Sequence, residues 1–218
     1  MYLHVYNVYP YSLLARLVGM DTTSTVMCWS MLLLAHHQDV QEKARANVLA
    51  HLGADRQACY ADRVSMKYLE AVINEVHRYG ANSPLTMPRR AVRDCIIRGF
   101  HIPKDTLVLS NLWAAHHQPD IWPDPDHFNP DANFTRVGED GELELTHLEH
   151  LTPFNIGKRA CIGESLARQE LLIFIAGLLQ RYRILPSADC PLPAESEFEF
   201  HGIGRHPLPY KVLFVPLD

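Results

Sequence analysis

One short segment of the chain combines residue types that could hold a metal ion or a reactive sulfur. Within "PFNIGKRACIG", five positions satisfy the spacing F-x-x-G-x-R-x-C-x-G: Phe154, Gly157, Arg159, Cys161 and Gly163. The thiolate, rather than the thiol, binds metals, and positive neighbours or a helix N-terminus favour that ionised form. Lys158, Arg159 and a helix expected to begin near Gly163 supply both. The segment therefore indicates a ligand or a partner for Cys161.

The alternative is an inert, buried cysteine beside a helix, which is the usual state of a lone thiol. The surrounding residues favour a ligand instead, because Gly157 and Gly163 would let the backbone approach something flat and Phe154 would shield the sulfur from water. The chain has five cysteines, an odd number, and no C-x-x-C pair. This argues against a disulfide framework or a zinc ribbon and favours reducing surroundings.

The elements that must position this loop are mostly helical. Helices are predicted over 25–37, where 21–24 precede the first turn, over 39–53, 65–80 and about 163–183. Short β-type runs cover 95–103 and 105–113, a polar turn covers 137–145, and 202–217 is typical of a hairpin. The proline-rich stretch 119–131 fits no regular element. With no repeat and no flexible linker, we expect one interdependent unit, mainly α with a small β portion.

Composition narrows the classes of function. The 218 residues are 47 % hydrophobic, enough for a sizeable core, and the formal charge of −5 gives no reason to expect a nucleic-acid partner. The longest apolar runs, Val26 to Ala35 and Leu171 to Leu179, are shorter than the roughly 20 residues needed to span a bilayer. We interpret them as core helices.

The loop 154–163 resembles the haem-binding loop of the cytochrome P-450 family, the haem-thiolate monooxygenases. Further motifs follow in the family's order: "GMDTTS" resembles its oxygen-activation stretch, "EVHR" its E-x-x-R pair, and "HIPKDTLVLSNLWAAHHQPDIWPDPDHFNP" its strand and meander section. "GIGRHPLPYKV" resembles the final substrate-lining turn. The resemblance covers about Leu17 to the C-terminus and is greatest to the animal microsomal branch that oxidises drugs and steroids. It implies the C-terminal half of that fold as one domain over 17–218, preceded by a poorly matching segment, 1–16.

The resemblance also implies roles for individual residues. Cys161 would be the axial thiolate on haem iron, with Phe154, Gly157 and Gly163 shaping the loop. Arg159 and Arg89 would meet the haem propionates. Asp21 and Thr22, which could otherwise be simple helix N-caps, would relay protons to bound oxygen, with Gly19 leaving room. Glu75 and Arg78 would form a buried pair that holds the meander.

Three departures from the family pattern qualify these expectations. Val18 stands where the family usually has Ala or Gly and would crowd the distal face of haem. Ala132 and Asn133 replace the usual basic or aromatic pair, so the Glu75–Arg78 pair is expected to lose support. The resemblance also implies that the chain begins at the central helix, so we expect it to lack the membrane anchor and most of the roofing helices.

The function implied by the resemblance is insertion of one oxygen atom from O2 into an apolar small molecule. The implied partners are an NADPH-dependent reductase, molecular oxygen and the membrane surface, at the cytoplasmic face of the endoplasmic reticulum. Two alternatives remain open from the sequence: a catalytically silent truncated form of such an enzyme, and a non-enzymatic helical binding protein with a structural cysteine.

Residues 1–218 alone are expected to be neither stable nor competent. The apolar faces of "TVMCWSMLLLA" and "LLIFIAGLL" would lie in water, and each large side chain so exposed forfeits roughly 1.5–3 kcal/mol. A hemin titration of the chain tests this expectation, and a cooperative melt with one tightly held haem and measurable hydroxylation would contradict it.

Overall fold

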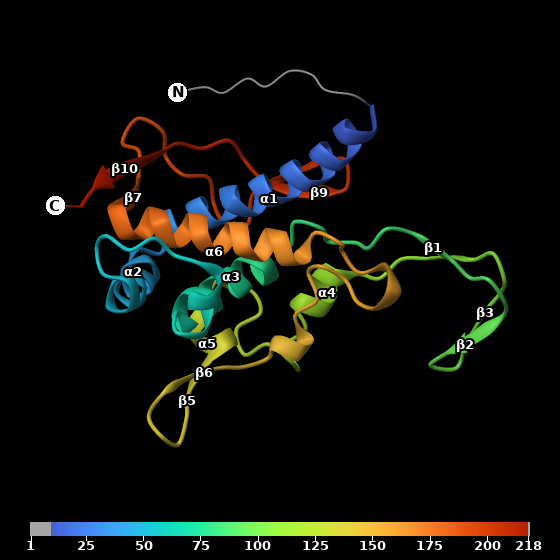
Figure 1. Ribbon diagram of the computed structural model, residues 1–218. Helices are drawn as coiled ribbons and strands as arrows, with labels where there is room; N and C mark the ends of the chain where they lie inside the picture. The colour runs from blue at the N-terminus through green and yellow to red at the C-terminus, as the bar shows by residue number, and fades with distance from the viewer. Residues whose placement is uncertain (1–9, 218) are drawn as a thin grey trace.

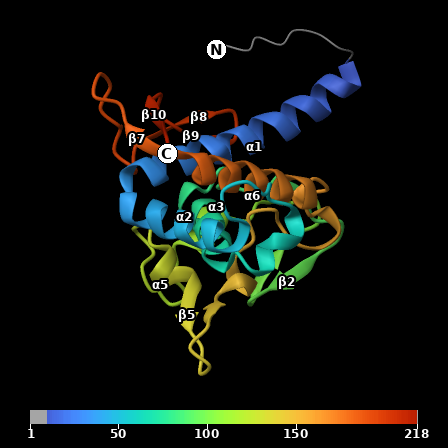
Figure 2. The ribbon, with the colours of Figure 1, turned by 60° about the vertical axis from the view of Figure 1, so that its left-hand side comes forward.

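Three helices pack on one another, and they carry or border most of the residues singled out above (Figure 1). They are α1 (Pro10–His36), α3 (Lys67–Gly80) and α6 (Glu164–Arg181). The computed structural model describes residues 10–217, and along α1 it describes side chains from residue 19 onward. Helix α2 (Gln38–Leu52) packs across α3 and α6, and Figure 2 shows α2 beneath the C-terminal part of α1.

The remaining helical elements are short, and the strands form antiparallel pairs. The short helices are η1 (Tyr60–Val64), α4 (Leu112–His116), α5 (Pro130–Phe134), η2 (Leu148–His150) and η3 (Gly157–Arg159). The pairs are β1 (Arg89–Arg90) with β4 (Leu107–Val108), β2 (Cys95–Ile97) with β3 (Phe100–Ile102), β5 (Thr135–Val137) with β6 (Leu143–Leu145), β7 (Tyr182–Pro186) with β10 (Val212–Pro216), and β8 (Phe198–His201) with β9 (Gly204–Pro207). The expected fold class, mainly α with a small β portion, is confirmed. None of the described helices is both long and apolar enough to cross a membrane.

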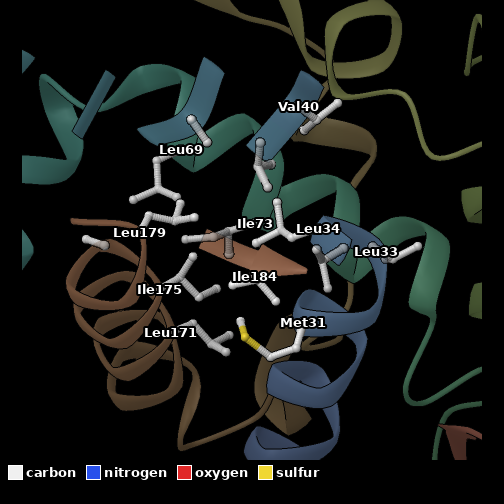
Figure 3. Packing of buried hydrophobic residues seen from close by; sticks show 14 of the residues in the cluster. Met31, Leu33, Leu34, Val40, Leu69, Ile73, Leu171, Ile175, Leu179 and Ile184 are labelled. Carbon is white, nitrogen blue, oxygen red and sulfur yellow. The ribbon is translucent and has the colours of Figure 1, made fainter. Parts of the chain in front are cut away.

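The core lies where α1, α2, α3, α6 and β7 meet (Figure 3). Figure 3 shows side chains from each of these elements converging, among them Leu34, Ile73, Ile175 and Ile184. The apolar run of α1 is buried in this core and does not lie in water as its sequence suggested. Helix α6 keeps part of its apolar run exposed, at Ile173 and Phe174.

Some local predictions are corrected by the structure. Residues 21–24 do not precede a helix, because α1 begins at Pro10, so Asp21 lies eleven residues inside it and the capping alternative is wrong. Helix α6 ends at Arg181 rather than at 183. The tail is not a hairpin of its own, because β9 pairs with β8 and β10 pairs with β7. The helix 39–53 with its end at Gly53 (φ +68°) is confirmed, and so is the β character of 95–103. This run is not one strand, however, because it folds back on itself as the pair β2 and β3.

Helix α3 carries a buried ion pair on which the neighbouring loops converge. Glu75 and Arg78 are both 0 % exposed, and Arg78 Nε and Nη2 donate to the two carboxylate oxygens over 2.7 and 2.8 Å. The other guanidinium hydrogens go to backbone carbonyls of His116, Asp124, Pro125 and His127. Burying charges is costly unless each is paired and hydrogen-bonded, and here both are.

The substitution at Asn133 does not weaken this pair. The Asn133 side-chain amide donates to Glu75 Oε1 over 3.0 Å, and the Asn129 backbone N–H donates to the same oxygen over 2.8 Å. Asn133 Oδ1 also accepts from the Asp124 backbone N–H. The neutral amide of Asn133 therefore bonds Glu75 in place of a second basic side chain. The expectation that the Glu75–Arg78 pair loses support is wrong.

We expect Glu75→Gln to lower the free energy of unfolding by about 3–5 kcal/mol, because it leaves the buried Arg78 charge without its counter-ion. The matched control is Arg136→Gln, whose Nε donates to Glu144 over the same 2.7 Å but at the surface. That change should alter the free energy by less than about 1 kcal/mol. Denaturant unfolding monitored by circular dichroism measures both, and equal midpoints for the two variants would contradict the prediction.

Candidate haem-thiolate site

The loop before α6 is a tight turn closed at its ends. The Cys161 backbone N–H donates to the Phe154 carbonyl over 2.8 Å, and the Ala160 N–H donates to the Gly157 carbonyl over 3.0 Å. Asn155 and Gly157 have φ of +65° and +76°, a left-handed conformation that glycine adopts without cost. A Cβ added at Gly163 would lie 3.8 Å from Cys161 Sγ, so the sulfur packs directly over this glycine. The motif's glycines therefore serve the loop's shape.

Phe154 anchors the loop to α3 and α6. Its ring meets the buried His77 edge-on at 5.1 Å between centroids, and the Arg168 guanidinium lies 4.9 Å from its centre. Two residues earlier, the Thr152 N–H donates to His116 Nε2 over 3.0 Å. Cys161 remains exposed, so the expected shielding of the sulfur by Phe154 is not seen.

The surroundings of Cys161 combine free cations with exposed apolar side chains. Lys158, Arg159 and Arg89 are exposed and form no ion pair with any described residue. Ile162, next to Cys161, is fully exposed, and Ile156 and Leu166 are exposed on either side of it. In Figure 1 the loop and β1, where Arg89 pairs with Val108, lie at the same end of the molecule as the N-terminal half of α1.

Asp21 and Thr22 lie on α1, in exposed positions in the middle of the helix. The Thr22 carbonyl accepts from Asn82 Nδ2 over 3.2 Å, and Asp21 Oδ2 lies 3.9 Å from His206 Nε2. Nothing lies within 4 Å of where a Cβ at Gly19 would be, as expected for an open helix face. The expectation for Val18, and the segment 1–9, fall outside the described side chains.

The structure thus places the predicted residues in two groups at one end of the molecule. One group is the loop with Cys161, and the other is the helical pair Asp21 and Thr22; both views set the N-terminal half of α1 above this loop (Figures 1 and 2).

Three residues near the site were missed by sequence reasoning. His116 and Asn133 looked like loop residues, yet both are buried and hydrogen-bonded around Arg78 or the loop. His206, in the tail, contacts α1 beside Asp21. Their partners are distant in sequence, so no local signal marks them; the one cue was the position of Asn133 where the family has another residue type.

The comparisons with known proteins decide what this arrangement belongs to. The family model for cytochrome P450 matches residues 16–214. The chain belongs to the cytochrome P450 family. Human cytochrome P450 2J2 is 39 % identical over 91 % of this chain, and the steroid 17-alpha-hydroxylase/17,20 lyase of Squalus acanthias is 38 % identical over 89 % of it.

Solved P450 structures share the fold. A zebrafish cytochrome P450 structure described with progesterone superposes with a TM-score of 0.82 at 36 % identity, covering 93 % of this chain and 45 % of that one. A second, described with abiraterone, gives 0.81 at 34 % identity. The chain spans 38 % of the length of the human relative and 37 % of the Squalus one.

The family implies a haem cofactor, and the residues of the loop fit one. Haem is flat and apolar with two carboxylates, so it requires an iron ligand, apolar contacts and cations. Cys161 offers an exposed thiol outside any disulfide, Ile156 and Ile162 offer apolar surface, and the arginines 89 and 159 are free to pair with carboxylates. Each requirement has a candidate in the described residues.

His77, which packs against Phe154 of the cysteine loop, should make the stability of the folded chain sensitive to acid. Burial lowers the pKa of His77 to about 3, and the Arg168 guanidinium adds to this. An unfolded histidine titrates near 6.5, so the unfolded chain binds the extra proton first and stability falls as pH drops from about 6.5 towards 3. The variant His77→Phe keeps a ring against Phe154 but has no group to protonate. Between pH 7 and pH 5 its free energy of unfolding should therefore fall by about 2 kcal/mol less than that of the parent.

The control for this measurement is His150→Phe, which replaces a half-exposed histidine. Denaturant unfolding at each pH provides the free energies. Parallel pH dependence in the parent and in His77→Phe would refute the assignment of this acid sensitivity to His77.

Proposed function

We propose that this chain supplies the thiolate-ligated side of a haem monooxygenase that inserts one oxygen atom from O2 into an apolar small molecule. The observation that carries the proposal is Cys161: an exposed thiol on a closed, glycine-shaped loop, next to exposed cations and a helix start. Bound haem would supply the activation of O2, a reaction that an axial thiolate promotes.

The loop residues would hold the cofactor. Cys161 would be the axial ligand, and the backbone closure between Cys161 and Phe154 would fix the sulfur in position. Gly157 and Gly163 carry no Cβ toward the bound group, and Phe154 keeps the loop against α3 and α6. Arg159 and Arg89 would pair with the propionates, since carboxylates bind arginine through charge-assisted hydrogen bonds.

The residues of α1 would manage protons on the opposite face. Asp21 has a largely exposed carboxylate, and Thr22 follows it one residue later. A carboxylic acid and an alcohol within reach of a reacting oxygen can pass protons to it as general acids. Gly19, one turn earlier on the helix, leaves the space for that oxygen.

The proposed partners follow from the family. They are an NADPH-dependent reductase as electron donor, molecular oxygen and an apolar small-molecule substrate; the zebrafish structure is described with progesterone, a molecule of this apolar kind. We place the protein at the cytoplasmic face of the endoplasmic reticulum membrane, as for the animal microsomal branch. The domain would run over 17–218, with 1–16 preceding it.

Cys161→Ala should abolish the long-wavelength absorption band that thiolate-ligated haem shows after reduction and treatment with carbon monoxide. The physical reason is that no other described cysteine lies in the loop. Cys95→Ala, in β2, is the control and should retain the band. A band that survives in Cys161→Ala would refute the ligand assignment, and its absence from the haem-loaded parent would favour a silent or non-enzymatic protein.

Thr22→Ala and Asp21→Asn should raise peroxide release per NADPH consumed by roughly tenfold or more, because protons then reach oxygen less efficiently. Haem content should stay unchanged in both. The control is Thr23→Ala, which changes the neighbouring alcohol on a different face of α1. The assay requires the haem-loaded protein with its reductase, and unchanged coupling in both variants would remove Asp21 and Thr22 from the mechanism.

A further inference from the structure

His206 on β9 lies directly against the part of α1 that carries Asp21. Its Nδ1 is 3.1 Å from Thr25 Oγ1, and its Nε2 is 3.9 Å from Asp21 Oδ2. The imidazole side chain is 13 % exposed, whereas the Asp21 side chain is 61 % exposed. His206 therefore bridges a buried hydroxyl and a solvent-facing carboxylate.

The protons on this bridge can be assigned by counting donors. Thr25 has one hydroxyl hydrogen, and it is donated to the Asp21 backbone carbonyl over 2.8 Å. Thr25 Oγ1 must then accept from His206, so Nδ1 carries the ring hydrogen. In the neutral ring Nε2 is consequently the bare acceptor, and it is buried with no hydrogen-bond partner among the described residues.

Two acceptors thus face each other, Nε2 of His206 and the carboxylate of Asp21. Such an arrangement is repulsive unless a proton lies between them, and one proton makes it an ion pair. Gly204 makes room for this ring, because a Cβ there would lie 2.9 Å from His206 Nε2. Since Nε2 is shielded from solvent, its proton can come and go through Asp21.

The other charged and titratable neighbours do not compete for Nε2. His201, on β8, lies against the His206 ring, tilted by 32° at 4.5 Å between centroids, and its own Nε2 is 3.0 Å from Glu199. Arg205 directs its guanidinium to the carbonyls of Tyr79 and Gly80. Asn82, from the loop after α3, is neutral and bonds Thr22.

We propose that His206 is a positioning residue that holds one proton for Asp21. The proton held on His206 Nε2 passes to the Asp21 carboxylate, and Asp21 gives that same proton to the distal side. Asp21 then takes up a replacement proton from solvent and returns it to Nε2. One proton enters and one leaves, with no change of oxidation state. This inference rests on the proposed role of Asp21, but the pair itself exists without haem.

The test is long-range ¹H–¹⁵N correlation of the chain labelled with ¹⁵N-histidine, which reports the protonation of each ring nitrogen. His206→Asn identifies the signals of His206, and it keeps a donor to Thr25 while removing the basic nitrogen. At pH 8 the ring should carry its hydrogen on Nδ1. Asp21→Asn should change the ¹⁵N shift of Nε2 and leave the ring hydrogen on Nδ1, because a side-chain amide can donate to the bare nitrogen whereas the carboxylate can only accept.

His201→Gln is the matched control and should leave the ring hydrogen of His206 on Nδ1, since His201 directs its own Nε2 to Glu199. A hydrogen on Nε2 at pH 8, or no response to Asp21→Asn, would overturn the proposal. In the loaded enzyme, His206→Asn should alter the pH profile of peroxide release and add nothing in an Asp21→Asn background. Should Asp21→Asn leave coupling unchanged while the spectra respond, the proposed function fails and the proton-sharing pair stands.

Discussion

The ion pair between Glu75 and Arg78 is the constraint on which the site depends. Both side chains are fully buried, and a buried charge is stable only when its hydrogen-bonding groups have partners. The surrounding chain must therefore follow a path that supplies these partners. The carbonyls of His116 and of residues 124, 125 and 127 must point at Arg78, while Asn129 and Asn133 must point at Glu75. A proline-rich stretch without regular structure over most of its length is thereby held in one conformation.

Two histidines next to the Glu75–Arg78 pair contact the cysteine loop. His116, whose carbonyl binds Arg78, accepts the Thr152 N–H with its ring. His77, between Glu75 and Arg78 on α3, packs on Phe154. Three arginines differ accordingly: Arg78 is buried and structural, whereas Arg89 and Arg159 are exposed and form no ion pair with the part of the chain that the structure describes, as cations for a bound carboxylate would be.

Local patterns predicted the parts of the fold that depend on neighbouring residues. The apolar spacing of α3 and the stop at Gly53 were evident from the sequence, and so was the cysteine loop, because its residues lie close together along the chain. The extension of α1 through Asp21 was not, since hydroxyl residues that favour caps also occur inside helices, where Ser24 and Thr25 bond the Asp21 carbonyl. The pairing of β9 and β10 with separate strands, and the roles of Asn133 and His206, depend on distant segments and could not be derived from spacing.

The central claim is that the buried pair on α3 holds the cysteine loop in its closed form. Native-state hydrogen exchange of the Cys161 amide, which bonds the Phe154 carbonyl, tests this most directly. The Gly141 amide, bonded to the Gly138 carbonyl in the turn between β5 and β6, is the internal reference. In Glu75→Gln the Cys161 amide should exchange roughly tenfold faster or more, a change of about 1.4 kcal/mol in local opening, while Gly141 keeps its rate. An unchanged rate at Cys161 would show that the loop is closed independently of the pair and would contradict the account.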